Sequence, residues 1–183
     1  MKSRFSYQTD IGKITIVENG NAITDLLFPK EELPQDAVNR ETGLLKEAGR
    51  QLENYLAGRQ TSFALPLAPK GTEFTQRVFE QLQAIPYGET RTYREIAEST
   101  GNRKAARAVG RACHVNPIPI FIPCHRVIGS NGTLTGFRVG LPLKELPVGT
   151  GKGAWASLGT ARPSWITCGR TTKSSGAPSM RGG

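Results

Sequence analysis

The sequence Pro123-Cys124-His125-Arg126-Val127 places a thiol, an imidazole and a guanidinium side by side. Cysteine attacks as its thiolate, and a thiol with a pKa of about 8.5 needs a neighbouring base or positive charge to ionise at neutral pH. His125 and Arg126 could supply both. A buried structural cysteine remains the alternative, because adjacent residues on a strand point to opposite faces. The motif therefore indicates a candidate nucleophile whose assignment depends on its surroundings.

The composition is that of a small protein without a metal site. Hydrophobic residues make up 37% of the 183 residues, enough to fill a core. No apolar run could cross a bilayer, residues 1–10 lack a signal-peptide core, and we expect a cytoplasmic protein without a membrane partner. The three cysteines have no zinc-ligand spacing, which suits a reducing compartment, and with only two histidines we expect no metal.

The net charge of +9 suggests a polyanionic partner, but its distribution weakens that inference. No acidic residue lies after position 146, whereas five basic residues do. The positive balance of residues 1–146 is modest. It is compatible with DNA binding and is weak support alone.

The first third of the chain predicts a sheet followed by a helix. Residues 4–7, 13–17 and 22–28 alternate apolar and polar side chains and are separated by turn sequences, which predicts an antiparallel meander. A helix follows that ends at Gly58. We expect its buried face to comprise Leu44, Leu45, Ala48, Leu52, Tyr55 and Leu56. The Pro-rich residues 65–69 are typical of a linker.

The next segment predicts a helical domain. One helix is capped near Thr72, and a capping-box pattern starts a second at Thr92 that Gly101 ends. A third helix, from residue 103 to about 113, completes a helix-turn-helix, and a hairpin at residues 131–132 could form its wing. The apolar residues 118–122 read as the strand leading to Cys124. This pattern is typical of a winged-helix DNA-binding domain.

The helix over residues 104–110 combines small residues with one long cation, Arg107. Small side chains let a backbone approach another surface closely, so the helix could dock into a DNA groove. The alternative is a solvated helix with an alanine-rich packing face.

Residues 86–138, taken together, closely resemble the active-site half of the O6-alkylguanine-DNA alkyltransferases. The resemblance is dense over residues 72–146, weaker over 1–71 and absent after Leu146. It implies an α/β fold with a ribonuclease-H-like sheet-and-helix domain at residues 1–67. A winged helix-turn-helix active-site domain is implied at residues 72–146.

The resemblance also implies a reaction. Cys124 would take the alkyl group from O6-alkylguanine in double-stranded DNA, with O4-alkylthymine as a second candidate lesion. The acceptor would react once, without a cofactor, and the protein would act as a monomer. His125 would serve through a bound water as base for the thiol.

Six further residues are implied to bind DNA or substrate. Arg107 would fill the space left by a flipped nucleotide, and Tyr93 would contact a phosphate. Tyr93 could equally be a core aromatic residue, and Asn116, implied to brace the turn below the strand, could simply end a helix. The remaining three are Arg126, Val127 and Arg138. The main chain at Val127 and Arg138 would read the guanine edge, and the charge of Arg126 would contact DNA.

The chain departs from the family pattern after Leu146. Gly151 stands where a glutamate bonded to the active-site histidine is expected, and 21 of the last 37 residues are Gly, Ser, Thr or Pro. We expect residues 147–183 to form an atypical, disordered tail. A one-base shift of the codons for residues 147–151 permits Leu-Leu-Ala-Leu-Glu, which suggests a reading-frame change. A divergent or engineered tail is the alternative.

Three other functions stay open. The chain could be an alkyltransferase inactivated by loss of the glutamate helix, or a lesion-sensing DNA-binding protein without activity. It could also be a Cys-His hydrolase, which would turn over and need no DNA.

Overall fold

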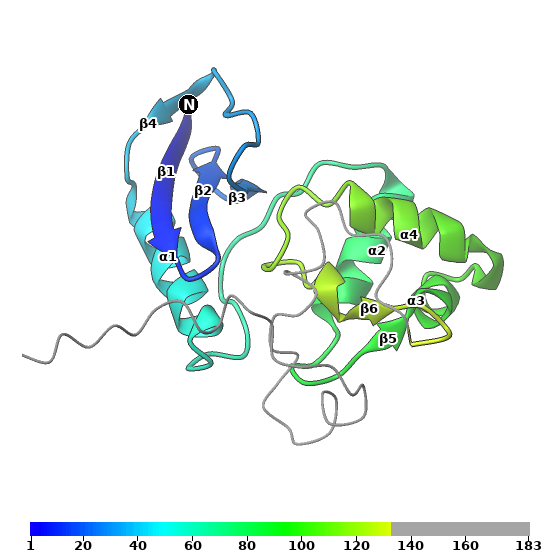
Figure 1. The fold of residues 1–183 in the computed structure, drawn as a ribbon. Coiled ribbons are helices and arrows are strands. Elements are labelled where there is room, and N and C mark those ends of the chain that lie inside the picture. Colours follow the sequence, from blue (N-terminus) through cyan, green and yellow to red (C-terminus); the bar gives the residue numbers. More distant parts are fainter. Residues whose placement is uncertain (133–183) are drawn as a thin grey trace, which may run out of the picture. The chain divides into compact units, whose positions relative to one another are not determined.

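A four-stranded sheet opens the chain, and the computed structural model describes residues 1–132 (Figure 1). Strands β1 (Lys2–Thr9), β2 (Gly12–Glu18) and β3 (Ile23–Leu27) pair antiparallel, which confirms the predicted meander. The sheet order is β3-β2-β1-β4. Strand β4 (Ala37–Asn39), which adds parallel to β1, was not predicted because three residues are too few to show an alternating pattern.

Helix α1 (Gly43–Leu56) packs on β1 and β2. Its first turn is capped by the Thr42 side chain, which accepts a hydrogen bond from the backbone of Leu45. A side chain at Gly49 would place its Cβ 2.5 Å from the Tyr7 ring, so glycine lets β1 approach the helix. Gly58 follows at φ +71°, as the predicted helix end requires.

The Pro-rich segment predicted as a linker covers the outer edge of β3. The backbone N–H of Ile23 donates to the carbonyl of Pro66 at 2.9 Å, and that of Ala68 donates to the carbonyl of Ile23 at 2.8 Å. Further along β3, Leu26 donates to the carbonyl of Pro117 at 2.8 Å. These bonds satisfy a strand edge that would otherwise be open to pairing with another chain.

The helices of the second region follow the predicted order. Helix α2 (Glu73–Gln83) is capped by Thr72, and α3 (Tyr93–Ser99) begins with the predicted capping box between Thr92 and Glu95. The third helix differs slightly, because its first turn is a 3-10 helix, η1 (Arg103–Ala105), before α4 (Ala106–His114). Two short strands, β5 (Arg91–Thr92) and β6 (Val127–Ile128), pair parallel beside them.

The segment expected to be a strand before Cys124 is not one. Within residues 118–122 only an isolated bridge between Pro119 and Ile122 forms, and Ile120 turns the chain at φ +75°. Prolines 117, 119 and 123 lack the N–H groups that a strand uses to pair. Cys124 instead begins a one-turn 3-10 helix, η2 (Cys124–Arg126), so the argument from opposite strand faces does not apply.

A single cluster of buried apolar side chains extends from Ile14 in β2 to Val127 in β6. Within residues 1–132 no helix is long and apolar enough to span a membrane, and no group of acidic, histidine or cysteine side chains is placed to hold a metal. Gly132 has the positive φ of a turn, +75°. The rest of the predicted wing, Arg138 and the predicted tail at 147–183 lie outside the described residues.

Candidate active site

The thiol of Cys124 is buried and held by Asn116. Cys124 is 1% exposed, and the side-chain amide of Asn116 donates a hydrogen bond to its Sγ at 3.2 Å. The same amide donates to the carbonyl of Ile122 at 3.1 Å, and Oδ1 of Asn116 accepts from the backbone of Ile118 at 3.0 Å. These bonds support the predicted bracing role. An N–H directed at sulfur also favours the thiolate over the thiol.

His125 is completely buried, and its ring forms a hydrogen bond with a residue that was not predicted to belong to the site. Nε2 of His125 lies 2.9 Å from the hydroxyl of Tyr55, in the last turn of α1. Burial raises the pKa of Tyr55 above its ordinary value, although the nearby Arg126 guanidinium works in the opposite direction. The phenol is therefore neutral at physiological pH. The sequence predicts that Tyr55 is buried, and a buried tyrosine hydroxyl usually has a hydrogen-bond partner. The sequence does not indicate that this partner is His125.

Arg126 points into the protein. It is 5% exposed, and its guanidinium donates to the carbonyl of Ile85 at 2.6 Å and to the hydroxyl of Tyr55 at 3.1 Å. The guanidinium carbon lies 5.5 Å from the centre of the Tyr87 ring. Within residues 1–132 no carboxylate forms an ion pair with it. The predicted DNA contact of Arg126 would require this side chain to leave these partners.

Aromatic rings enclose Tyr55. The ring centres of Phe63 and Tyr87 lie 4.8 and 5.8 Å from that of Tyr55, and Phe63 lies 4.7 Å from Phe121. These contacts link α1 to the turn that precedes Cys124.

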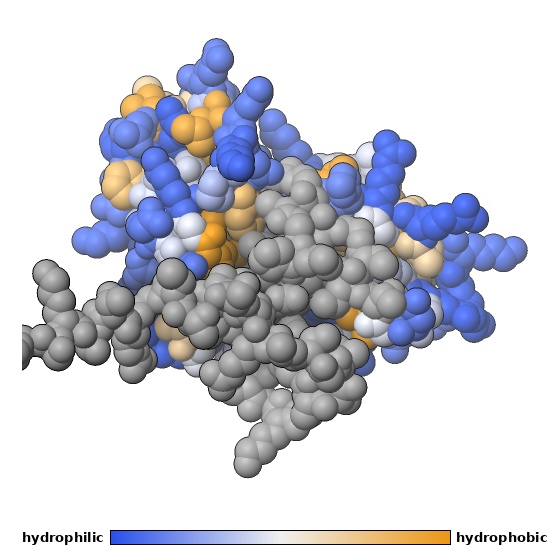
Figure 2. Space-filling view, viewed as in Figure 1, coloured by the Kyte–Doolittle hydropathy of each residue, from blue (hydrophilic) through white to orange (hydrophobic). Residues whose placement is uncertain are grey.

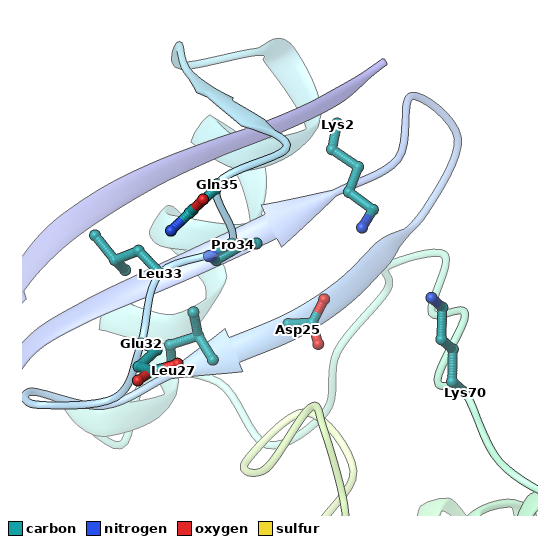
Figure 3. A pocket seen from close by; sticks show the side chains of 8 residues that line it. All are labelled: Lys2, Asp25, Leu27, Glu32, Leu33, Pro34, Gln35 and Lys70. Atoms are coloured by element: carbon teal, nitrogen blue, oxygen red, sulfur yellow. The ribbon is translucent and has the colours of Figure 1, made fainter.

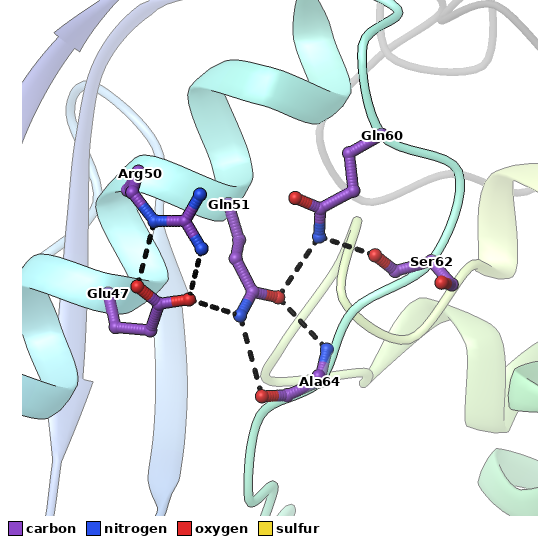
Figure 4. A network of polar contacts seen from close by, with 6 residues as sticks. All are labelled: Glu47, Arg50, Gln51, Gln60, Ser62 and Ala64. Atoms are coloured by element: carbon purple, nitrogen blue, oxygen red, sulfur yellow. Dashed lines mark hydrogen bonds and ion pairs between the residues drawn. The ribbon is translucent and has the colours of Figure 1, made fainter.

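Gln51 holds the segment that carries Phe63 against α1 (Figure 4). Its Oε1 accepts from the backbone of Ala64 at 2.9 Å and from the side chain of Gln60 at 3.1 Å. Its Nε2 donates to Glu47 at 2.7 Å. Gln51 is 4% exposed, so this network fixes the loop from a buried position.

Helix α4 and the turn before it present a cationic face to solvent. Lys104, Arg107 and Arg111 are exposed at helical spacing, whereas Val109 and Ala112 are buried on the opposite side. None of the three cations forms an ion pair within the described residues. The surface over α3 and α4, on the right of Figure 2, is mainly hydrophilic.

The remaining predicted residues have different positions. Tyr93 is the first residue of α3 and is partly buried, with its ring beside Gly110 of α4. Val127 is buried in β6. The structure thus brings Cys124, His125, Arg126 and Asn116 together, and places Tyr93 and Arg107 on the α3–α4 pair.

Two hollows lie on the surface of the described residues. One of about 270 Å³ is lined by residues of the aromatic cluster, including Phe63, Tyr87 and Phe121, and by Arg126. A larger one of about 740 Å³ lies on the first sheet (Figure 3). Its lining combines Lys2 and Lys70 with Asp25 and Glu32, so the charges offset one another and no nucleophile is present. Of these two hollows, only the smaller one is lined by a residue of η2, the turn that carries Cys124.

Comparison with known proteins covers both regions of the chain. Residues 73–147 match the family model of the 6-O-methylguanine DNA methyltransferase DNA-binding domain, and residues 4–69 match that of its ribonuclease-like domain. The methylated-DNA–protein-cysteine methyltransferase of Methanosarcina acetivorans is 49% identical over 76% of this chain and 91% of its own length. The constitutive enzyme of Bacillus subtilis is 46% identical over 71% of this chain and 82% of its own length.

Solved structures agree with these matches. The O6-methylguanine methyltransferase of Mycobacterium tuberculosis superposes with a TM-score of 0.73 at 40% identity, covering 81% of this chain and 91% of that one. A crystal structure of the M. tuberculosis protein in complex with DNA superposes with a TM-score of 0.69 at 42% identity, covering 74% and 83%. The chain therefore belongs to the 6-O-methylguanine DNA methyltransferase family.

Proposed function

We propose that this protein repairs DNA by direct transfer of an alkyl group from O6 of guanine to Sγ of Cys124. The new S–C bond forms as the bond between the alkyl carbon and O6 breaks, and guanine regains a proton on its ring. The observation that carries the proposal is the hydrogen bond from Asn116 to a buried cysteine sulfur, next to a histidine, in a family of this activity. A buried thiol directed by an amide is suited to one substrate delivered to it.

The product explains why no cofactor is needed. The thiol itself accepts the carbon, and a thioether is a poor leaving group for water, so each molecule reacts once. His125 is placed in the same turn and assists ionisation of the thiol. A Cys-His hydrolase would form a thioester intermediate that water can cleave, whereas alkyl transfer to sulfur gives a thioether.

DNA is proposed to bind across α3 and α4 in the manner of a winged helix. The exposed cations of α4 would contact the phosphate backbone, and Arg107 would enter the base stack as the damaged nucleotide leaves it. Tyr93, at the start of α3, would contact a phosphate. The main chain at Cys124, Val127 and Arg138 would read the guanine edge. A crystal structure of a 42% identical M. tuberculosis relative in complex with DNA supports DNA binding by this chain.

A domain boundary at residues 67–72 and an atypical tail at 147–183 complete the proposal. The two family models match residues 4–69 and 73–147 separately, which supports the proposed boundary between the two regions. A protein that depends on a reduced thiol and acts on DNA is suited to the cytoplasm. One molecule carries every residue invoked for the transfer, so we propose a monomer.

Reaction with excess substrate tests this function. Duplex DNA containing O6-methylguanine is mixed with the protein at a fivefold molar excess of DNA, and the amount of restored guanine is measured over time. The proposal predicts a single phase that stops at one guanine per protein molecule. Continued turnover would indicate a hydrolase, and DNA binding without any restored guanine would indicate a lesion sensor.

A further inference from the structure

One exposed histidine lies on the cationic face of α4. His114 is the last residue of the helix, three residues after Arg111 and seven after Arg107. At about 100° per residue, these three side chains fall within about 60° of one another around the helix axis. Val109 and Ala112 are buried on the opposite side. His114 therefore extends the row of Arg107 and Arg111 by almost one further helical turn.

The imidazole of His114 is accessible to a binding partner. Its ring is exposed, and no hydrogen bond or ion pair joins it to another side chain among residues 1–132. The chain has only two histidines, and the other, His125, is completely buried. Imidazole is the side chain that ordinarily gains its charge between pH 8 and pH 5, a range in which lysine and arginine stay positive. His114 is thus the one group on this face whose charge depends on pH near neutrality.

The elements that pack against α4 offer no carboxylate that neutralises a charged His114. These elements are α2, α3 and η1. Their titratable and charged side chains, besides Lys104 of the cationic face, are Glu73, Arg77, Glu80, Tyr93, Arg94, Glu95, Glu98 and Arg103. Three of the four carboxylates are bound to arginines or to a nearby backbone N–H. The fourth, Glu80, is exposed, and within residues 1–132 no ion pair joins it to His114.

The spacing of these side chains along α4 suits a DNA backbone. With Arg107 in the base stack, as proposed above, Arg111 and His114 lie on the same face about 6 and about 10 Å further along the helix. Phosphates of one DNA strand follow one another at about 3.4 Å of rise, so the two side chains are far enough apart to reach different phosphates. A protonated imidazole donates from both ring nitrogens, whereas a neutral one has a single N–H. Protonation therefore supplies both a charge and a donor at this position.

We propose that His114 is a protonation-dependent phosphate contact, which makes the affinity of this protein for DNA rise as the pH falls. The protonated ring adds a fourth cation to the face formed by Lys104, Arg107 and Arg111, and its binding releases further counterions from the duplex. By linkage, DNA binding draws a proton onto His114. The inference rests on the proposed binding of DNA across α4 and is independent of alkyl transfer.

The salt dependence of binding tests this contact, because its slope reports how many phosphates are neutralised. Affinity for an undamaged duplex is measured over a range of salt concentrations at about pH 6 and about pH 8. The variants are His114→Gln, which cannot gain the charge, and His114→Arg, which carries it at both pH values. The matched control adds Lys46→His to His114→Gln, which returns a titratable imidazole to an exposed position on α1.

The expected results differ for each protein. In the unmodified protein, affinity rises about two- to fivefold from pH 8 to pH 6, the range of one exposed ion pair. The slope of log affinity against log salt becomes steeper by up to about 0.9 over the same change. His114→Gln keeps the shallower slope at both pH values, with or without Lys46→His. His114→Arg shows the steeper slope at both.

Proton uptake gives a second measurement that needs no variant. Calorimetric titration of the unmodified protein with DNA, in two buffers of different ionisation enthalpy, should show uptake of a fraction of a proton near pH 7. No uptake, or equal slopes at pH 6 and pH 8, would overturn the proposal. An undiminished pH effect in His114→Gln, or its return on adding Lys46→His, would do the same. Melting temperatures identify a variant that does not fold.

The outcome is distinguishable from that of the proposed repair function. Slopes that depend on His114, in a protein that restores no guanine, would leave this contact in place and refute the repair reaction. Restored guanine with slopes that do not depend on pH would refute only the contact. A protein that binds no DNA at either pH would refute the contact and the proposed use of α4.

Discussion

The side-chain amide of Asn116 lies 3.2 Å from Sγ of Cys124 and donates a hydrogen bond to it. Asn116 follows α4, the helix with the exposed cationic face, by two residues. One residue thus connects the helix proposed to bind DNA with the sulfur proposed to react. Its other two hydrogen bonds, to the backbone of Ile118 and Ile122, fix it in that place.

Replacing this amide with a carboxylate should slow the reaction. Asn116→Asp keeps the shape and the acceptor for Ile118 but puts a negative charge beside the sulfur, which disfavours the thiolate. A shift equivalent to one pH unit would reduce transfer from free O6-benzylguanine about tenfold at pH 7. The loss should shrink as the pH rises and the thiolate forms in both proteins. Equal rates at pH 7 would show that the bond does not tune the thiol.

Loss of the Arg107 side chain should separate DNA handling from chemistry. We expect Arg107→Ala to slow repair of duplex DNA by about tenfold or more, because nucleotide extrusion is impaired. Reaction with the free base should stay within about twofold. Arg77→Ala is the control: it removes one exposed charge from α2, where Arg77 pairs with Glu73. If Arg107→Ala slows both substrates equally, Arg107 supports the fold or the thiol.

The Glu47 carboxylate should make stability depend on pH. Hydrogen bonds from Arg50 and then Gln51 lower the pKa of Glu47 from 4.5 to about 2. A lowered folded-state pKa adds stability above the unfolded value, and this stability is lost as the pH falls from about 4.5 toward 2. Glu47→Gln should therefore lower the urea concentration at which half of the protein is unfolded at pH 7. The decrease should be smaller at pH 2.5.

A second carboxylate serves as the control for this pH effect. Glu80 is exposed on α2 and forms no ion pair among residues 1–132, so Glu80→Gln should shift the midpoint equally little at both pH values. A Glu47→Gln difference that persists unchanged at pH 2.5 would mean that the carboxylate charge is not the source of the effect.

Local patterns predicted most elements because their causes are local. The capping box at Thr92 and the alternation in the first strands depend on neighbours within a few residues, and both are present. The segment at 118–122 was mispredicted because its apolar content outweighed its prolines. The sequence placed Tyr55 on a buried helix face. The hydrogen-bond partner of its hydroxyl, His125, lies seventy residues away, and only the fold brings the two side chains together.

Restoring the expected C-terminal helix should increase activity. The test variant carries Leu-Leu-Ala-Leu-Glu in place of residues 147–151 and lacks residues 152–183, and it is compared with the unmodified protein. Loss of an orienting carboxylate in a related relay costs as much as about 10⁴ in rate, so we expect single-turnover transfer to be at least tenfold faster after restoration. The melting temperature should also rise, because the helix would cover apolar surface.

Equal rates and equal melting temperatures would refute this account of the tail. The nucleotide sequence gives a second test, since the shifted reading frame must contain a glutamate codon at the fifth position and no stop before it.

The most direct measurement maps where the alkyl group goes. Duplex DNA carrying O6-methylguanine with a radiolabelled methyl group is incubated with the protein and with Cys124→Ser, and the labelled peptide is identified after digestion. We predict one label per molecule, on Cys124, and none on the serine variant, because a serine hydroxyl is scarcely ionised near pH 7. The serine variant should still bind DNA, because the proposed groove contacts lie elsewhere. Label on Cys113 or Cys168, or undiminished labelling of Cys124→Ser, would contradict the assignment of Cys124 as the acceptor.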